Sequence, residues 1–353
     1  MSGQRVLLVG YGPTAASALR SLLAQVEVTA VVTDAPVPGS GAADLARTHH
    51  VAVVGPSTPA EIAHLAREQR VDAIVISSYN RILRFAAPAP LPAPLPAPLM
   101  VNVHYAPLPR YRGRAAVNWA ILNGEPSTAI HRVDEGLDSG NILYQEEVPI
   151  GPRDTVGALY ERLNALQERH LGPAVVAALA GDPGRPQDHA RATYGCARVP
   201  DDGAIDWTQP TEQLDRLIRA LDPPFPAAFT VFDGKRLLVH RAEPVRDPPA
   251  YAGAVPGRVI ARSATEGWVE VLTGCGALRL WEVEVEGSGP TPAARLIRST
   301  RATLGLRVGD LLRRLEALEA ASRGGGGRAA AAAGATPTAG EFETWISKTR
   351  GSW

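Results

Sequence analysis

The chain has 353 residues, 45% of them hydrophobic, and a formal net charge of zero at pH 7. A chain of this length exceeds one typical core, so two domains are the natural expectation. The zero net charge provides no global field that would draw the protein to nucleic acid or to an anionic membrane.

The first part of the chain alternates strands with helices. Short apolar runs typical of buried parallel strands occur at residues 5–10, 28–33, 51–54 and 73–76. Helices are predicted between them at residues 15–23, 41–49 and 59–69. The alternation predicts an α/β fold with a doubly wound, mostly parallel, Rossmann-like sheet. Ligands bind beyond the carboxyl ends of such strands, where residues 77–83 and 102–104 are expected.

The first strand ends in Gly10-Tyr-Gly12, which is half of a dinucleotide-binding fingerprint. Ala15 stands where the third glycine belongs, and Asp34 is a candidate acidic partner for a ribose hydroxyl. A half-motif is weak evidence, so we predict a tight strand-to-helix turn.

Proline alternates with other residues from Pro88 to Pro98, just before the segment that carries Asn102. This pattern disfavours helix and sheet and favours extended polyproline II, so we predict a surface spacer. Residues 155–179 predict a long helix with leucines near one face, and Gly172-Pro173 is expected to kink or break it.

The second half is predicted to form a smaller β-domain. A short helix at 214–221 precedes strand-like runs at residues 228–232, 236–240, 257–261, 268–273 and 278–284. Five short strands with polar turns suggest a small OB-like β-barrel. We therefore expect a catalytic domain at 1–200, an OB-like domain at 201–318 and a flexible Gly/Ala-rich tail at 319–353.

Cysteine usage and hydropathy suggest a cytoplasmic protein. Cys196 and Cys275 have no metal-ligand spacing, which argues against a zinc site or a disulfide framework. The first residues carry no signal-peptide pattern. No apolar run approaches the roughly 20 residues that a membrane span needs, so no membrane partner is expected.

One amide, one imidazole and one carboxylate stand out as candidate catalytic groups. Asn102 and His104 are two residues apart at a strand end, so their side chains point to one side. Asp138 follows on a loop that can fold back toward them. A histidine can move a proton, an amide can donate to an oxyanion, and a carboxylate can orient the ring and stabilise imidazolium. This chemistry needs neither a metal nor a serine or cysteine nucleophile.

The surroundings of this trio resemble the active-site signature of the formyltetrahydrofolate-dependent formyltransferases. The matching runs follow one another in the family's order: Asn102-Val-His104, Leu108-Pro-Arg-Tyr-Arg-Gly113, Asn118-Trp119, Asn123-Gly-Glu125 and His131-Arg-Val-Asp-Glu-Gly-Leu-Asp138-Ser-Gly140. The resemblance implies that Asn102, His104 and Asp138 carry catalysis and that N10-formyltetrahydrofolate is the cofactor. It places the cofactor-binding residues at Ile82, Leu83, Arg84, Arg114, Asp134, Glu135, Gly136, Leu137 and Asp138. Arg112 and Arg114 have a structural alternative, in which they clamp the loop to a carboxylate.

Within the family, the acceptor is expected to be a small-molecule amine on a nucleotide-linked amino sugar. Residues 111–119 are similar to the corresponding run of the amino-sugar enzymes, whereas residues 217–226 resemble a segment that these share with methionyl-tRNA formyltransferase. Basic and acidic residues are nearly balanced over 205–323, which argues against tRNA. Methionyl-tRNA formylation, formylation of an amino acid or antibiotic precursor, and a non-catalytic folate- or partner-binding module remain alternatives. A homodimer is also left open.

Overall fold

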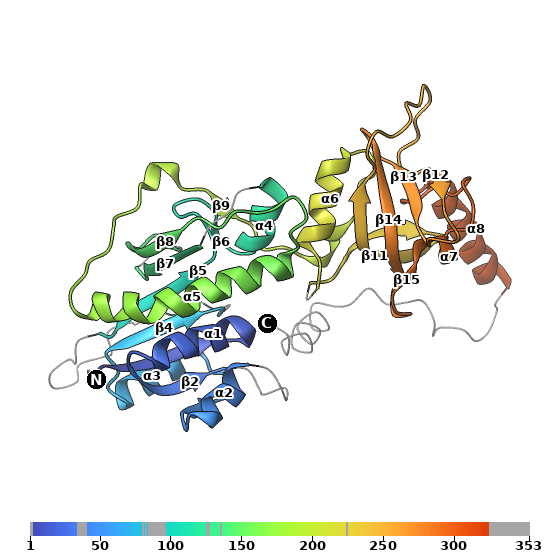
Figure 1. Ribbon diagram of the computed structural model, residues 1–353. Helices are drawn as coiled ribbons and strands as arrows, with labels where there is room; N and C mark the ends of the chain where they lie inside the picture. The colour runs from blue at the N-terminus through green and yellow to red at the C-terminus, as the bar shows by residue number, and fades with distance from the viewer. Residues whose placement is uncertain are drawn as a thin grey trace. The chain divides into compact units, whose positions relative to one another are not determined.

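The computed structural model describes residues 3–33, 41–79, 81, 83, 97–124, 128–134, 136–223 and 225–324. The chain divides into two compact units, and the boundary lies between Ala197 and Arg198 (Figure 1). Asp34, most of the proline-rich run and the tail from residue 325 lie outside the described residues. No helix in the described part of the chain is long and apolar enough to cross a membrane.

The first unit is built on a seven-stranded sheet with the order β3-β2-β1-β4-β5-β7-β8. Its strands are β1 (Arg5–Gly10), β2 (Glu27–Val32), β3 (Ala52–Val54), β4 (Ala73–Ser77), β5 (Leu99–His104), β7 (Thr128–Arg132) and β8 (Ile142–Glu146). The first five strands are parallel, and β7 and β8 are antiparallel to their neighbours. The predicted doubly wound, mostly parallel sheet is therefore confirmed.

The described residues of this unit form α-helices that accompany the sheet (Figure 1). They are α1 (Gly12–Leu23), α2 (Ala42–Thr48), α3 (Pro59–Glu68), α4 (Ala116–Asn123) and α5 (Val156–Leu179). Helix α1 begins three residues before its predicted start because the chain turns directly from β1 into the helix. A Cβ atom on Gly10 would lie 1.9 Å from the Ser77 carbonyl oxygen, so the close approach of β4 accounts for this glycine.

A kink or a break was expected in the long helix α5 at Gly172-Pro173, and the break does not occur. The helix continues as one α-helix from Val156 to Leu179 with Pro173 inside it. Packing against α1 explains this: the Gly172 N–H donates to Ser21 Oγ at 2.9 Å, and a Cβ atom on Gly172 would lie 2.5 Å from the Ser21 carbonyl oxygen. Tertiary packing thus outweighs the local cost of the proline. The leucines expected on one face are buried, namely Leu159, Leu163, Leu166 and Leu171.

A short parallel pair lies beside the main sheet. Strand β6 (Arg112–Gly113) pairs with β9 (Tyr194–Gly195), which joins the segment after β5 to the segment after α5. The 3-10 turn η1 (His189–Arg191) precedes β9. This pair fixes the segment around Arg112 next to the carboxyl end of β5.

The second unit is an antiparallel sheet with the order β10-β11-β14-β13-β12, and β15 adds to β14. The strands are β10 (Ala228–Phe232), β11 (Lys235–Pro244), β12 (Val259–Arg262), β13 (Val269–Leu272), β14 (Ala277–Val285) and β15 (Thr291–Pro292). Its helices are η2 (Pro200–Gly203), α6 (Thr211–Ala220), α7 (Ala293–Leu296) and α8 (Val308–Gly324). Apolar side chains from the sheet and α6 form its core.

Residues 302–305 join the two ends of this sheet. Leu304 N–H donates to the Gly257 carbonyl oxygen at 2.7 Å beside β12, and Gly305 N–H donates to the Val231 carbonyl oxygen at 2.9 Å in β10. Val259 N–H donates in turn to the Ala302 carbonyl oxygen at 3.0 Å. The closing segment therefore gives the antiparallel sheet the barrel-like closure that the short strands predicted.

Candidate active site

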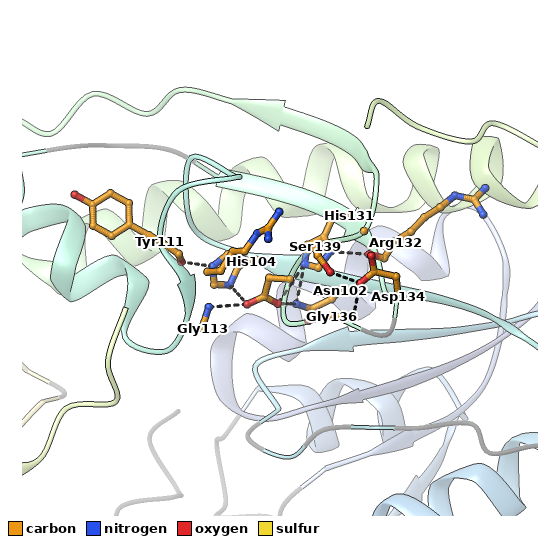
Figure 2. A network of polar contacts seen from close by, with 12 residues as sticks. Asn102, His104, Tyr111, Gly113, His131, Arg132, Asp134, Gly136 and Ser139 are labelled. Atoms are coloured by element: carbon orange, nitrogen blue, oxygen red, sulfur yellow. Dashed lines mark hydrogen bonds and ion pairs between the residues drawn. The ribbon is translucent and has the colours of Figure 1, made fainter. Parts of the chain in front are cut away.

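The candidate site lies where the end of β5 meets the loop between β7 and β8 (Figure 2). Asn102 and His104 both lie on β5, and Asp138 lies on the loop. Strand β7 pairs with β5 so that His131 is opposite Asn102. The structure thus brings the three predicted catalytic side chains together and adds a second imidazole.

Asp138 is the centre of this cluster. Its Oδ1 atom accepts a hydrogen bond from Asn102 Nδ2 at 3.3 Å and lies 3.5 Å from His131 Nε2. Its Oδ2 atom accepts from the Gly113 N–H at 2.8 Å and lies 3.8 Å from His104 Nδ1. One carboxylate therefore contacts both strands of the β5–β7 pair and the segment that follows β5.

The side-chain amide of Asn102 is oriented by its neighbours. Its Nδ2 atom also lies 3.1 Å from His131 Nε2. His131 Nδ1 lies 2.7 Å from the Arg132 carbonyl oxygen, which can only accept, so Nδ1 carries the hydrogen and Nε2 is the acceptor. The amide hydrogens of Asn102 are then directed at Asp138 and at His131. His131 is 1% exposed, so this arrangement is shielded from water.

The ring of His104 is held by the main chain of the following loop. His104 Nε2 lies 2.7 Å from the carbonyl oxygen of Tyr111, so Nε2 is the protonated nitrogen. The lone pair of neutral His104 is therefore on Nδ1, which faces Asp138. Tyr111 adopts φ 55°, a left-handed conformation that turns the chain at this point.

Burial and charge set the protonation states of the site. Burial lowers the pKa of His104 below its usual value, although the Asp138 carboxylate and the Tyr111 carbonyl oppose this effect. Burial alone would raise the pKa of Asp138, but the hydrogen bond and charge that protonated His131 supplies, the charge of protonated His104 and the Gly113 N–H hold that pKa well below its usual range. At neutral pH the site therefore holds an ionised carboxylate beside a neutral imidazole that can take up a proton.

The predicted cofactor-binding residues lie partly on the loop that carries Asp138 and partly outside it. Asp134, Gly136 and Leu137 lie on the loop that carries Asp138, and the Gly136 N–H donates to Asp134 Oδ1 at 3.0 Å. Arg114 is exposed and follows Gly113 directly, whereas the Leu83 side chain is buried in the core. The other predicted cofactor residues lie outside the described residues, namely Ile82, Arg84 and Glu135.

These residues fit a folate formyl donor by the chemistry of their groups. The loop offers main-chain groups and an exposed Leu137 side chain beside a proton-accepting imidazole and an amide donor. Within the described residues, no group of three or more His, Cys, Asp or Glu side chains could hold a metal ion.

Two contributors to the site were not singled out from the sequence. His131 was seen only as part of a motif, because a pairing of β5 with β7 is needed to place it opposite Asn102. Gly113 contributes a main-chain N–H, which no side-chain pattern reveals. Arg112 donates to the amide oxygen of Gln187 at 2.7 Å and, among the described residues, forms no ion pair, so the alternative in which it clamps a carboxylate does not hold for this arginine.

Both units of the chain match a known protein family. Residues 13–176 match the family described as formyl transferase, and residues 199–301 match the formyl transferase C-terminal domain. The chain is 36% identical over 334 residues to the methionyl-tRNA formyltransferase of Roseiflexus sp., covering 90% of this chain and 98% of that protein. It is 32% identical over 329 residues to the methionyl-tRNA formyltransferase of Geobacter sulfurreducens, covering 88% of this chain and 98% of that protein.

Two solved structures share the fold at lower identity. HypX from Aquifex aeolicus in complex with tetrahydrofolic acid gives a TM-score of 0.57 at 20% identity and matches 85% of this chain. This chain spans about half of HypX, 48% of its length. An N-formyltransferase from Helicobacter canadensis, solved with folinic acid and dTDP-3-aminofucose, gives 0.59 at 17% identity, covering 78% of this chain and 98% of that one.

Proposed function

The chain belongs to the formyl transferase family, and on that premise we propose that it transfers the formyl group of N10-formyltetrahydrofolate to the amino group of methionyl-tRNA. The enzyme class and the folate cofactor follow from the family itself. The assignment of the acceptor rests on one observation, which is how much of the related proteins' length aligns with this chain. Proteins named methionyl-tRNA formyltransferase align through both units of this chain and over 98% of their own length.

This acceptor replaces the nucleotide-linked amino sugar that the sequence favoured. The solved sugar formyltransferase is 17% identical, which supports the shared fold and leaves the acceptor open. The balance of charge over residues 205–323 argued against tRNA, but a total does not describe how charge is distributed over a surface. Phosphate contacts need only a local group of basic side chains.

One stretch of the second unit is basic in sequence. Residues 287–309 contain no Asp or Glu. Within this stretch four arginine side chains are exposed, namely Arg295, Arg298, Arg301 and Arg307. These arginines supply the local positive charge that binding to a nucleic-acid backbone requires.

His104 is the proton acceptor in the proposed mechanism. When bound, N10-formyltetrahydrofolate supplies a formyl group on an amide-like nitrogen. An α-amino group has a pKa of about 7.7–8.0, so a useful fraction is neutral near pH 7 and can attack. His104 Nδ1 takes the proton that the amine loses as the new C–N bond forms, and the nearby Asp138 Oδ2 stabilises the resulting imidazolium. His104 would then return this proton to the donor nitrogen as the old C–N bond breaks, so that tetrahydrofolate leaves as a neutral amine and the imidazole is neutral again.

Asn102 donates to the negative charge that develops on the formyl oxygen. Its Nδ2 hydrogens point to Asp138 and His131, and the 3.3 Å bond to Asp138 is the longer of the two contacts. We assign the catalytic hydrogen bond to the Asn102 hydrogen that points to Asp138. This hydrogen would leave Asp138 and donate to the oxyanion, while the contact with His131 keeps the amide group in place.

An acceptor assay with purified full-length protein tests the proposal. N10-formyltetrahydrofolate is supplied with methionyl-tRNA, with UDP- and dTDP-linked amino sugars, or with free amino acids, and formylated product is read by mass. We expect turnover with methionyl-tRNA. Turnover with a nucleotide-linked amino sugar or an amino acid, and none with methionyl-tRNA, would overturn the proposed acceptor.

Charge removal tests the arginine group. The double variant Arg298→Gln and Arg301→Gln should raise the KM for methionyl-tRNA by about tenfold. The slope of log binding constant against log salt concentration should become shallower by the amount expected for about two lost phosphate contacts. The matched control is Arg47→Gln with Arg70→Gln in the first unit, which changes the net charge equally. If the two pairs weaken binding to the same degree, the arginine group is not a specific contact.

A further inference from the structure

The buried side chain of Gln187 connects Arg112 to the loop that carries Asp138. Its Nε2 atom donates to the Asp138 carbonyl oxygen at 2.8 Å and to the Gly140 carbonyl oxygen at 2.7 Å. Its Oε1 atom accepts from Arg112 Nη2 at 2.7 Å and from Arg112 Nε at 3.3 Å. Both hydrogens of the Gln187 amide group are thus used to hold one loop.

Arg112 determines which way the Gln187 amide points. A guanidinium group has donors only, so Gln187 must present its oxygen to Arg112 and its NH2 group to the loop. Both residues are buried, Arg112 with 3% and Gln187 with 6% of its surface exposed. Water therefore competes little for these bonds, and the charge of Arg112 strengthens its bond to Gln187.

Arg112 is itself fixed by the β6–β9 pair. Its main-chain N–H donates to the Thr193 carbonyl oxygen at 2.9 Å. Its Nη2 atom also lies 3.0 Å from His189 Nδ1, which must accept this bond. The segment 187–195 and residues 111–114 therefore form one hydrogen-bonded assembly that supports the loop.

The loop needs such support because of its backbone conformation. Asp138 adopts φ 49°, in the left-handed region that costs energy for a residue with a Cβ atom. Gly113, the residue after Arg112, donates its N–H to the Asp138 carboxylate. Two consecutive residues thus act on Asp138, one on its carboxylate and the other, through Gln187, on its carbonyl group.

We propose that Arg112 and Gln187 are positioning residues for formyl transfer, which hold the Asp138 loop so that the Asp138 carboxylate faces His104 and Asn102. They do not touch the reacting atoms. They affect the reaction by fixing the position of the Asp138 carboxylate, which in turn influences the protonation of His104. The proposal is independent of which amine accepts the formyl group.

Two substitutions of Gln187 separate positioning from packing. Gln187→Glu keeps an acceptor for Arg112 but loses both N–H donors to the loop, whereas Gln187→Met loses the acceptor as well. If the loop bonds matter, both variants should lower kcat at saturating substrates by at least about tenfold. If Gln187 only serves as a partner for the buried guanidinium, Gln187→Glu should keep the wild-type kcat and only Gln187→Met should be impaired.

A titration of His104 gives a readout that does not depend on an acceptor. Because the Asp138 carboxylate raises the pKa of His104, displacing the loop should lower that pKa in Gln187→Met. The shift is measured by NMR of the imidazole protons, with His104→Gln used to assign the signal. The same shift should appear in the pH profile of kcat, measured with methionyl-tRNA as the acceptor.

The matched control is Asn141→Asp. Asn141 is the residue after Gly140, and its Nδ2 atom donates to the Pro183 carbonyl oxygen at 2.9 Å, so this change also replaces an amide donor with a carboxylate at a main-chain carbonyl. Its kcat and the His104 pKa should match those of wild type. An unchanged kcat and an unchanged His104 titration in both Gln187 variants would overturn the proposal. Should Gln187→Met fail to fold, Gln187→Glu and Arg112→Lys are compared in its place, and a wild-type kcat and titration in both would overturn it equally.

Discussion

The Nε2 atom of His104 lies 2.7 Å from the main-chain carbonyl oxygen of Tyr111. This contact commits the Nε2 hydrogen to the backbone and leaves Nδ1 as the nitrogen that can take up a proton. The proton-accepting Nδ1 atom therefore faces Asp138 already in the absence of substrate. A neutral main-chain group sets the tautomer, and the carboxylate remains available to stabilise the charge that forms later.

The first prediction concerns the roles of His104 and Asp138. His104→Gln removes the proton acceptor, and Asp138→Asn removes the charge that stabilises imidazolium, so each should lower kcat by about 100-fold to 10,000-fold. Binding of N10-formyltetrahydrofolate, measured by calorimetry, should largely survive. Rates close to wild type in either variant would remove that residue from the proposed mechanism.

The second prediction concerns the acid limb of the pH profile. His104 must be neutral to accept a proton, and burial lowers its pKa below the ordinary value of 6.5. The decline of kcat that belongs to His104 should therefore have its midpoint below pH 6.5, separate from the loss of neutral amine near the amine's own pKa of about 7.7–8.0. Asp138→Asn removes a group that raises this pKa, so its residual activity should decline at a still lower pH. An acid limb that moves upward in Asp138→Asn would contradict this account.

The third prediction concerns His131, which accepts a hydrogen bond from Asn102. His131→Phe keeps a ring in this buried position but leaves an Asn102 N–H without its partner, which costs about 1–3 kcal/mol. If that cost falls on the transition state, kcat should fall by roughly 5-fold to 150-fold. His131→Gln offers an acceptor again and should recover part of the rate. The control is His64→Gln, an exposed histidine on α3, which should leave kcat unchanged.

The fourth prediction concerns the contact of α1 with α5. A Cβ atom added at Gly172 would lie 2.5 Å from the Ser21 carbonyl oxygen, so Gly172→Ala should destabilise the first unit by about 1–3 kcal/mol. Thermal unfolding followed by circular dichroism measures this loss. Gly55→Ala serves as the control, because a Cβ atom there has no heavy atom within 4 Å. Equal melting temperatures for the two variants would show that the helices can move apart at little cost.

Local pattern was sufficient to predict most of the first unit. The apolar run of β1 and the periodic residues of α3 are determined by residues close by in the sequence. Thr58 and Glu61, for example, form a capping box at the start of α3. Asn102 and His104 could be paired from sequence because residues two apart on a strand share a side. Asp138 could be added because its motif resembles a known family.

Long-range contacts set the limit of the sequence prediction. His131 reaches Asn102 only because β7 pairs with β5, and Gln187 reaches Asp138 across 49 residues of chain. Gly172-Pro173 was expected to kink or break α5 because local rules describe an isolated helix, whereas the helix continues here with Gly172 packed on α1. Helix α4 was not predicted, since its sequence lacks a clear polar face.

The closing segment of the second unit has a consequence for how this protein can be shortened. The family match ends at residue 301, one residue before the segment that joins β10 to the start of β12. A chain cut there would keep every strand of the sheet yet expose two ladder edges with unsatisfied N–H and C=O groups. Exposed edges of this kind template pairing between molecules, so the shortened protein should aggregate. A chain cut after Arg307 keeps both edges covered and should stay monodisperse.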